Sequence, residues 1–158
     1  MKEILMIGTG GTIASEMTPE GYAPELTSEQ LLNYVPDISD FCSVTCTQVC
    51  NLDSTNITPD IWLDIAETIR RNYDRYDGFV IAHGTDTMAY SAAAMSYLVQ
   101  NSPKPIIFTG SQKPINSETT DSKTNLRDSF ICASADTLSG VFIVFNGKVI
   151  LGTRARKT

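Results

Sequence analysis

Short apolar runs alternate along the chain with longer segments in which apolar residues recur every three or four positions. The first run, at residues 4–7, is bulky and stops at a glycine, and such runs are typical of strands buried on both faces of a parallel sheet. We expect further strands at residues 44–50, 79–82, 105–109 and 141–145, and a last one at 148–151 after a hairpin turn at Asn146-Gly147.

The segments between these runs carry helix signals. Thr27 begins a capping box that opens a short helix, and this helix should end before Pro36. Thr58 as the cap and Pro59 as the first residue open a second helix with one apolar stripe. Two more helices are expected, one at residues 88–100 and one that follows a polar loop ending at about Thr120 and runs through Leu126, Phe130 and Ala133. Strands that alternate with helices predict an α/β fold, with a doubly wound, mainly parallel sheet and helices on both faces, as in flavodoxin and Rossmann-like folds. The strand order is left open.

A polar segment from Ser15 to Glu25 separates the first strand from the first helix. It contains Gly21 and two prolines, and we expect it to form a loop. A glycine-containing loop beside the carboxyl end of a strand can close over a site as a lid, and this one carries Tyr22.

Length and composition indicate the class of protein. A chain of 158 residues corresponds to about one domain, and 42% hydrophobic with 19% charged residues is ordinary for a soluble globular protein. The net charge of −6 argues against a nucleic acid or an anionic membrane as a partner. The sequence contains neither a membrane-spanning apolar stretch nor a signal-peptide pattern, so we expect a cytoplasmic location.

Three of the four cysteines are evenly spaced, at Cys42, Cys46 and Cys50. This spacing matches no zinc motif, and the segment that holds them is predicted to be a strand. We therefore interpret them as small buried hydrophobic residues in a reducing compartment. The sequence predicts neither a metal site nor a cofactor.

Candidate polar residues follow the predicted strands. They are Thr9 and Thr12 after the first strand, Ser54 and Thr55 after the second, Thr85 and Asp86 after the third, and Ser111 and Lys113 after the fourth. Because the carboxyl ends of parallel strands share one edge of the sheet, these residues should converge there although they are far apart in sequence. This edge is the expected ligand site.

Two familiar classes of site do not fit the sequence. Gly8-x-Gly10 begins a dinucleotide-binding motif, but Ile13 stands where the third glycine is required, and no P-loop occurs. His83 is the only histidine, and no Gly-x-Ser-x-Gly elbow is present, so a Ser-His-Asp hydrolase is not supported. We interpret His83 as a structural residue.

A threonine can act as a nucleophile when a lysine or a tyrosine takes its proton. The pair Thr85-Asp86 permits two interpretations. Thr85 could cap a helix with Asp86 as an acid in its first turn. Alternatively, Asp86 could bind the ammonium group of a ligand while nearby helix amides receive a carboxylate. The second interpretation describes an amino-acid site.

Two segments together resemble the signatures of the bacterial-type L-asparaginase family. They are Gly8 to Ala14 (GTGGTIA) and Asp77 to Tyr90 (DGFVIAHGTDTMAY). The segment Ser111 to Ile115 (SQKPI) and the lack of a signal peptide are more similar to the cytoplasmic type I branch than to the secreted type II branch. The resemblance covers residues 1–158 but only the amino-terminal domain of a family whose members are about twice as long.

The resemblance implies catalytic roles for particular residues. Thr12 corresponds to the nucleophile, which attacks a side-chain amide to give an acyl-enzyme and release ammonia. Tyr22 corresponds to the mobile-loop tyrosine that assists it. Thr85 corresponds to a second essential threonine, which forms a second triad with Asp86 and Lys157. A solvated lysine in a chain tail would have the same local sequence as Lys157.

The same resemblance implies how the substrate, L-asparagine, is bound. Asp53, Ser54 and Thr55 correspond to the segment that holds its α-carboxylate, with Ser54 as the principal contact. Asp86 corresponds to the acid that pairs with its α-ammonium. The resemblance also implies a homo-dimer or tetramer, in which the carboxy-terminal domain of a neighbouring copy completes the site.

These 158 residues stop before such a second domain. We therefore expect asparagine hydrolysis from the full-length architecture, and weak or no activity from this piece alone. Two alternatives stay open: the asparaginase-like subunit of a tRNA-dependent amidotransferase, and a non-catalytic amino-acid-binding domain. The amidotransferase subunit would be expected to carry an extra amino-terminal domain, whereas the first strand here starts at residue 3 or 4.

Overall fold

The computed structural model describes residues 1–11, 13, 16–18, 21–23, 27–52, 57–113, 115–118 and 120–154. For residues 16–18, 21–23 and 51–52 it describes the backbone alone.

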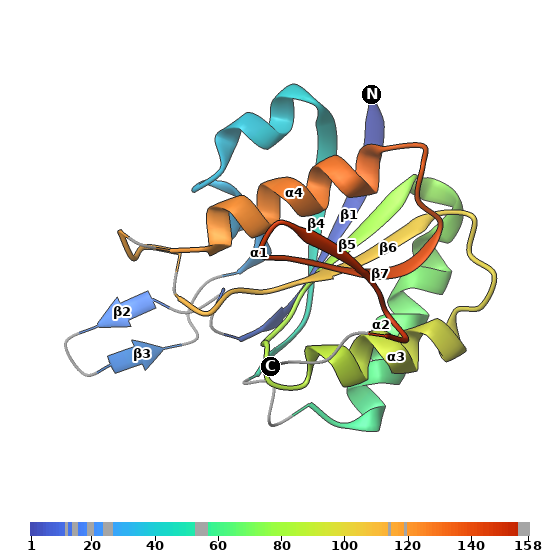
Figure 1. Ribbon diagram of the computed structural model, residues 1–158, viewed down its shortest axis with the longest axis horizontal. Helices are drawn as coiled ribbons and strands as arrows, with labels where there is room; N and C mark the ends of the chain where they lie inside the picture. Colours follow the sequence, from blue (N-terminus) through green and yellow to red (C-terminus); the bar gives the residue numbers. More distant parts are fainter. Residues whose placement is uncertain are drawn as a thin grey trace.

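A six-stranded sheet forms the centre of the fold (Figure 1). In spatial order its strands are β4 (Cys42–Leu52), β1 (Lys2–Gly10), β5 (Gly78–Ala82), β6 (Pro105–Thr109), β7 (Gly140–Phe145) and β8 (Lys148–Leu151). The strands from β4 to β7 are parallel, and β8 runs antiparallel to β7. This arrangement confirms the predicted doubly wound α/β fold and supplies the strand order.

Helices cover both faces of the sheet, as predicted. On one face lie α1 (Ser28–Leu32) and α4 (Ser122–Ser134), and on the other lie α2 (Pro59–Asn72) and α3 (Met88–Leu98) (Figure 1). Successive strand residues point to opposite faces. Met6 therefore packs in the core beneath α1 and α4, and Ile7 packs in the core beneath α2 and α3. None of the helices in the described ranges is long and apolar enough to cross a membrane.

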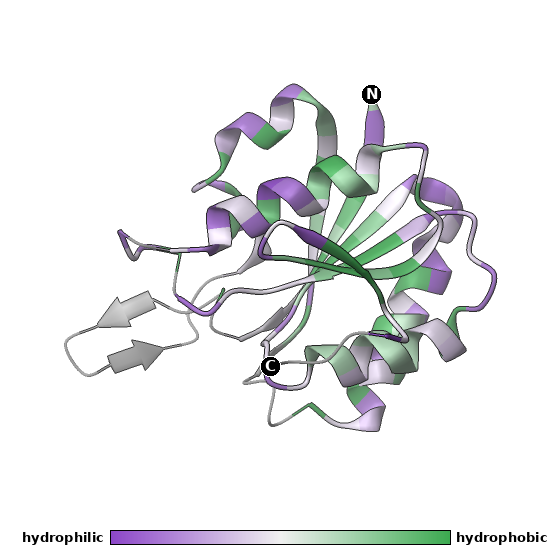
Figure 2. Cartoon of the chain, in the orientation of Figure 1, coloured by the Kyte–Doolittle hydropathy of each residue, from purple (hydrophilic) through white to green (hydrophobic). Residues whose placement is uncertain are grey.

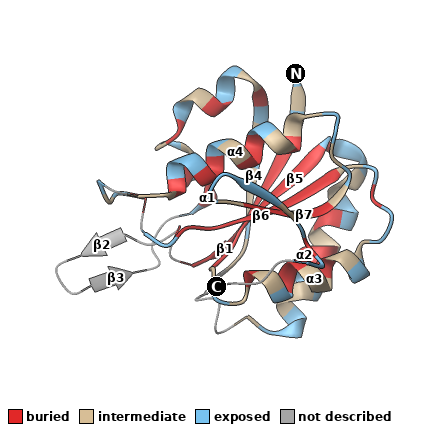
Figure 3. Ribbon diagram, in the orientation of Figure 1, coloured by how far each residue is buried: buried red, intermediate tan, exposed pale blue. Residues whose placement is uncertain are grey.

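The central strands of the sheet, β1, β5 and β6, are largely apolar (Figure 2) and buried (Figure 3). All residues of β5 and β6 are buried, which agrees with the unbroken apolar runs that predicted these strands. Burial of both strand faces fixes the sheet rigidly, so the loops at its carboxyl edge start from well-defined positions.

Local signals determine where two of the helices begin. Thr27 Oγ1 accepts a hydrogen bond from the Gln30 amide at 3.3 Å, and Gln30 Oε1 accepts one from the Thr27 amide at 2.8 Å. This reciprocal pair confirms the predicted capping box. Thr58 occupies the N-cap position of α2 and Pro59 is its first residue, also as predicted.

The first helix is shorter than predicted. It ends at Leu32, and Pro36 begins a separate 3-10 helix, η2 (Pro36–Asp40), rather than only stopping α1. Proline suits the first position of a helix because its missing N–H would have no partner there. A second 3-10 helix, η4 (Tyr73–Arg75), follows α2.

The polar segment 15–25, which was predicted to be a loop, contains a hairpin. Its strands β2 (Glu16–Thr18) and β3 (Gly21–Ala23) pair antiparallel, with Met17 opposite Tyr22. Strands of three residues are too short for hydrophobic alternation to separate them from a loop. The side chain of Tyr22 lies outside the described part of the chain.

The hairpin between β7 and β8 has the predicted turn. Asn146 and Gly147 both have positive φ, 52° and 72°, which is the requirement of the two-residue turn that asparagine and glycine favour.

Burial raises the pKa of the Cys42 and Cys46 thiols to about 11, so both stay protonated and unreactive. Cys42 is buried, as predicted, whereas Cys46 and Cys50 are only half-buried.

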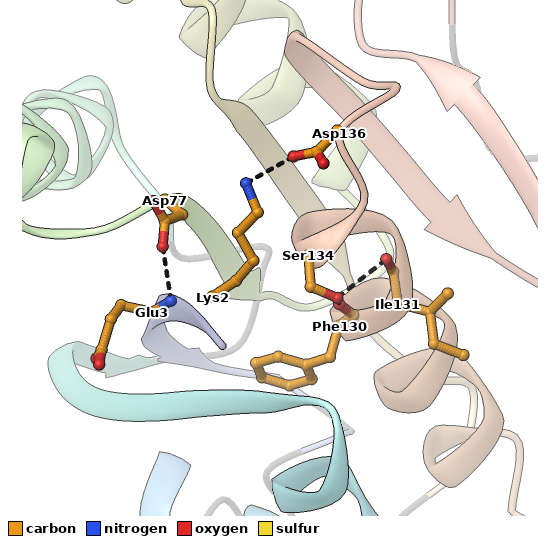
Figure 4. Close-up of polar contacts among 7 residues, drawn as sticks. All are labelled: Lys2, Glu3, Asp77, Phe130, Ile131, Ser134 and Asp136. Atoms are coloured by element: carbon orange, nitrogen blue, oxygen red, sulfur yellow. Dashed lines mark hydrogen bonds and ion pairs between the residues drawn. The ribbon is translucent and has the colours of Figure 1, made fainter.

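Contacts of the first strand tie the amino-terminal edge of the sheet (Figure 4). Lys2 Nζ pairs with Asp136 Oδ1 at 2.6 Å, and the Glu3 amide donates to Asp77 Oδ2 at 2.8 Å. The hydrogen bond and the opposite charge raise the pKa of Lys2 and lower that of Asp136. The side chains of Asp136 and Asp77 therefore contact β1 at the amino-terminal edge of the sheet, while the candidate site lies at the opposite, carboxyl edge.

Candidate active site

The carboxyl ends of β1 and β5 touch through their backbones. Gly11, directly after β1, has φ 84°, and a Cβ atom built on it would lie 2.5 Å from both N and Cα of Gly84. Real Cβ atoms essentially never come within 3.0 Å of another heavy atom, so only glycine fits here. The space that a side chain at Gly11 would need is taken by the backbone that follows β5.

The end of β6 joins the same cluster. A Cβ on Gly110 would lie 2.2 Å from the carbonyl oxygen of His83 and 3.3 Å from Cγ2 of Thr85. The His83 amide also donates to the Thr109 carbonyl at 2.8 Å. The ends of β1, β5 and β6 are therefore packed into one backbone junction, and this confirms the predicted convergence for the described residues.

Thr9 belongs to the framework of this junction. It is 1% exposed, and its Oγ1 donates to the Ala82 carbonyl at 2.7 Å. The Cys50 thiol lies 3.4 Å from the Thr9 carbonyl oxygen, on the β4 side. Because its hydroxyl is buried and bonded to the neighbouring strand, Thr9 links strands, and Thr12 is the better ligand candidate of the two.

His83 is fully buried beneath the junction. Its Nδ1 lies 2.6 Å from the Gly84 carbonyl oxygen, and its Nε2 lies 2.8 Å from Ser91 Oγ. Burial lowers the pKa of the imidazole. A neutral ring with both nitrogens bonded agrees with the structural role that was inferred for His83.

The stability of the fold should fall in mild acid because of His83. Above about pH 6.5 the imidazole is neutral in both the folded and the unfolded chain. Below that value the unfolded chain takes up a proton that the folded chain resists, since the folded-state pKa is lowered. The free energy of unfolding should then drop by up to about 1.4 kcal/mol per pH unit until the folded-state pKa is reached.

Urea unfolding between pH 7.5 and 5 would measure this drop. His83 is the only histidine, so a folded His83→Gln variant should show a flatter profile over the same range. If the free energy of unfolding depends on pH equally in both proteins, the lowered pKa of His83 is contradicted.

Thr85 and Asp86 follow the junction directly. α3 begins at Met88 with Thr87 at the N-cap position, so the interpretation of Thr85 as the cap and Asp86 as a first-turn acid is wrong. Thr85 is partly exposed and Asp86 is exposed. The ligand-binding interpretation of the pair stays a prediction.

The loop after β6 is held by two side chains of α4 and its start. Asn125 is 1% exposed, donates to the Gly110 carbonyl at 2.8 Å and accepts from the Asn146 amide at 3.0 Å. The Asp121 carboxylate accepts from the Gln112 amide at 2.9 Å. Sequence reasoning missed both residues. The signal available was a polar Asn125 on the apolar stripe that contains Leu126 and Phe130, a position at which an asparagine must find buried partners.

The candidate Ser111 also serves this loop. It is buried, and its Oγ donates to the Lys113 carbonyl at 2.6 Å, while the Lys113 amide lies 3.1 Å from Asp121 Oδ1. Ser111 is thus used in shaping the loop, and Lys113 is exposed.

The remaining predicted site residues fall outside what the structure describes. These are Thr12, the Tyr22 side chain, Asp53, Ser54, Thr55 and Lys157. The residues that precede two of them are nevertheless placed: Gly10 pairs with Leu52 across β1 and β4. The starts of the segments that hold Thr12 and Asp53 are therefore neighbours, and Gly11 joins them to the Thr85 segment. Within the described ranges, no three His, Cys, Asp or Glu side chains are grouped to hold a metal ion.

Comparisons with known proteins agree with this geometry. The family model described as "Asparaginase, N-terminal" matches residues 3–158. The L-asparaginase of Thermococcus kodakarensis is 38% identical over 156 residues, which cover 98% of this chain and 47% of that protein. The crystal structure of L-asparaginase I from Vibrio cholerae superposes with a TM-score of 0.91 at 37% identity, over 99% of this chain and 48% of the other.

A second group of relatives has a different name. A glutamyl-tRNA(Gln) amidotransferase subunit of Metallosphaera sedula is 35% identical over 149 residues, which cover 92% of this chain and 34% of that protein. The chain spans about half the length of the asparaginases that it matches and a third of this amidotransferase protein.

Proposed function

Because the chain belongs to the asparaginase family, we propose that it binds L-asparagine and serves the hydrolysis of its side-chain amide to L-aspartate and ammonia. The observation that carries the proposal is the contact of Gly11 with Gly84. Thr12 follows the first glycine in sequence and Thr85 follows the second. One backbone contact therefore brings together the starts of the two threonine segments that the reaction needs.

In the proposed reaction, the Thr12 hydroxyl attacks the amide carbonyl carbon of the substrate. Tyr22, as the tyrosinate, takes the hydroxyl proton and passes it to the amide nitrogen, so that the C–N bond breaks and ammonia leaves. Water then hydrolyses the acyl-enzyme ester to give L-aspartate and restore the hydroxyl. Thr85 and Lys157 assist proton transfer in this scheme. The resemblance of the sequence supports these roles.

Binding would use groups on both sides of Thr12. Ser54, with Asp53 and Thr55, would hold the α-carboxylate, and Asp86 would pair with the α-ammonium. The register of Gly10 with Leu52 supports this division, since Leu52, which precedes Asp53 in sequence, lies beside the end of β1, while β5 flanks β1 on its other side.

The exposure of Asp86 supports low activity for these residues alone. An ion pair made by an exposed carboxylate contributes only about 0–1 kcal/mol, because water screens it. Tight binding needs further groups that exclude water from the ammonium. We therefore propose that the 158 residues bind weakly and turn over slowly or not at all. The full-length protein would be a cytoplasmic homo-dimer or tetramer.

The similarity to an amidotransferase component favours a second candidate function. In that role the same site would release ammonia to a partner protein instead of to solvent. Ammonia release that appears only in the presence of such a partner would favour this alternative. A non-catalytic amino-acid-binding domain is the third possibility, and it predicts ligand binding without ammonia.

The proposal is tested by replacing Asp86. L-Aspartate, the product, should bind the wild-type chain in calorimetry, and Asp86→Asn should weaken binding about two- to fivefold, since the charge that pairs with the ammonium is removed and an exposed ion pair contributes up to about 1 kcal/mol. Asp74→Asn is the matched control, because Asp74 is also exposed but lies in η4, ahead of the amino end of β5. Ammonia release from L-asparagine is measured in parallel at high protein concentration.

The outcomes separate the candidate functions. Binding that Asp86→Asn alone removes supports the amino-acid site, and ammonia release adds the enzyme. Equal loss in both variants, or neither binding nor ammonia in the wild type, contradicts the proposed site.

A further inference from the structure

Three side chains from three elements form a continuous hydrogen-bonded chain that ends at the junction. Trp62 Nε1 on α2 donates to Ser91 Oγ on α3 at 2.7 Å. Ser91 Oγ lies 2.8 Å from His83 Nε2, and His83 Nδ1 lies 2.6 Å from the Gly84 carbonyl oxygen. We call this the Trp62–Ser91–His83 chain.

The chemistry of its two ends sets the direction of every hydrogen bond. An indole nitrogen can only donate, and a carbonyl oxygen can only accept. His83 must therefore carry its proton on Nδ1, and its Nε2 must accept the hydroxyl proton of Ser91. Ser91 in turn accepts from Trp62. For a neutral imidazole, which burial favours by lowering the pKa of His83, only one arrangement of protons satisfies all four groups: His83 protonated on Nδ1.

The chain ends on the peptide unit that leads into Thr85. A peptide group is planar, and the bond between Gly84 and Thr85 is trans, so its C=O and N–H point in opposite directions. Fixing the Gly84 oxygen against His83 therefore also fixes the direction of the Thr85 N–H, away from His83. Rotation of this one peptide would change the direction in which the backbone enters Thr85 and Asp86.

Packing against the preceding peptide, between His83 and Gly84, restrains the approach to the Gly84–Thr85 peptide. Gly11 lies against N and Cα of Gly84, and Gly110 lies against the His83 carbonyl oxygen. His83 and Ser91 are both fully buried. Burying the His83 ring nitrogens and the Ser91 hydroxyl costs free energy unless each is hydrogen-bonded. An apolar side chain at position 83 would fill the core equally well but would leave the Gly84 oxygen without a donor.

We propose that His83 is a positioning residue which, with Ser91 and Trp62, fixes the Gly84–Thr85 peptide and so sets how Thr85 and Asp86 are presented to an amino-acid ligand. The part of this inference that concerns the ligand rests on the proposed function. The part that concerns the peptide does not.

Two substitutions each remove a different hydrogen bond of the Trp62–Ser91–His83 chain. Ser91→Ala removes the donor to His83 Nε2, and Trp62→Phe keeps a ring of similar shape but removes the indole N–H. Ser91→Thr restores the hydroxyl. Ser96→Ala is the matched control: Ser96 lies on the same helix, and its hydroxyl donates to the Ala92 carbonyl instead.

Nitrogen-15 NMR of the chain reads the peptide directly. The wild-type imidazole should show the Nδ1–H tautomer; the Nε2–H tautomer would overturn the proposal. In Ser91→Ala and Trp62→Phe the amide resonances of Thr85 and Asp86 should shift, while Ser96→Ala and Ser91→Thr should leave them near their wild-type positions. If Ser91→Ala does not fold, Trp62→Phe alone decides. If a variant that folds and lacks one of these hydrogen bonds shows unshifted Thr85 and Asp86 amide signals, the proposal is overturned.

Calorimetry with L-aspartate tests the ligand part. Ser91→Ala and Trp62→Phe should weaken binding about two- to fivefold, with Ser91→Thr close to wild type and Ser96→Ala unchanged. Equal affinities for Ser91→Ala and Ser96→Ala would overturn the link to the ligand. If the wild type does not bind L-aspartate, the proposed function fails, and the NMR shifts still decide whether His83 positions the peptide.

Discussion

Alanine in place of Gly11 should destabilise the fold by about 3 kcal/mol or more, the largest stability effect that we expect from adding one methyl group. Two costs add. The φ of 84° lies in the left-handed region, where a side chain costs about 1–2 kcal/mol. The new Cβ would also lie 2.5 Å from N and Cα of Gly84, and these are backbone atoms that cannot rotate away. Either β1 or the Gly84 turn must move.

Gly147→Ala separates these two costs. Gly147 also has a left-handed φ, 72°, but no heavy atom of the described residues lies within 4 Å of a Cβ built there. This variant should lose only the conformational part, about 1–2 kcal/mol. Urea unfolding measures both. If Gly11→Ala is no more destabilising than Gly147→Ala, the close contact between the ends of β1 and β5 does not exist, and the proposed site loses its basis.

The same substitution has a functional consequence under the proposed function. A shift of the Gly84 turn would displace Thr85 relative to Thr12, and misplacement of reacting groups by about 1 Å can cost a hundredfold in rate. Gly147 lies in the turn between β7 and β8, so its variant should keep its affinity for L-aspartate. Stability and binding should therefore fall together only at Gly11.

Much of the fold follows from local pattern. Strands β5 and β6 are fully buried runs of five apolar or small residues, and no other element type fits such short runs between helices. The caps at Thr27 and Thr58 were equally readable, because capping uses side-chain types that the sequence displays directly. The strand order was not readable, since it depends on the direction that each crossover takes.

The features that the sequence predicted wrongly or not at all depend on contacts between distant residues, which a local pattern does not contain. In Thr85-Asp86-Thr87 both threonines are acceptable caps, and only the packing of α3 selects Thr87. The convergence of polar loops followed from the parallel sheet, but the contact between Gly11 and Gly84 requires distances below 3 Å that no pattern contains. The buried partners of Asn125 lie 15 and 21 residues away, which puts them equally out of reach.

Thr12→Ala should lower ammonia release from L-asparagine by at least about a thousandfold, because removing the nucleophile of a covalent mechanism leaves only binding and transition-state contacts. Affinity for L-aspartate should change less than about threefold, since the hydroxyl takes part in bond formation more than in ground-state binding. The measurement is ammonia formed in a single turnover, with protein in excess, so that slow turnover by these 158 residues is still detected.

Two variants act as controls for this substitution. Thr12→Ser keeps the hydroxyl and should retain part of the activity. Thr124→Ala removes an exposed threonine hydroxyl on α4 and should change nothing.

Should the wild-type chain release no ammonia, an activated β-ester of L-aspartate tests the nucleophile without turnover. Its better leaving group makes acylation easier, and peptide mass spectrometry locates the acyl group. Acylation at Thr12 that disappears in Thr12→Ala supports the mechanism. Undiminished ammonia release by Thr12→Ala, or acylation that stays elsewhere in the chain, would falsify the assignment of Thr12 as the nucleophile. The Gly11–Gly84 contact would then serve the fold and not the reaction.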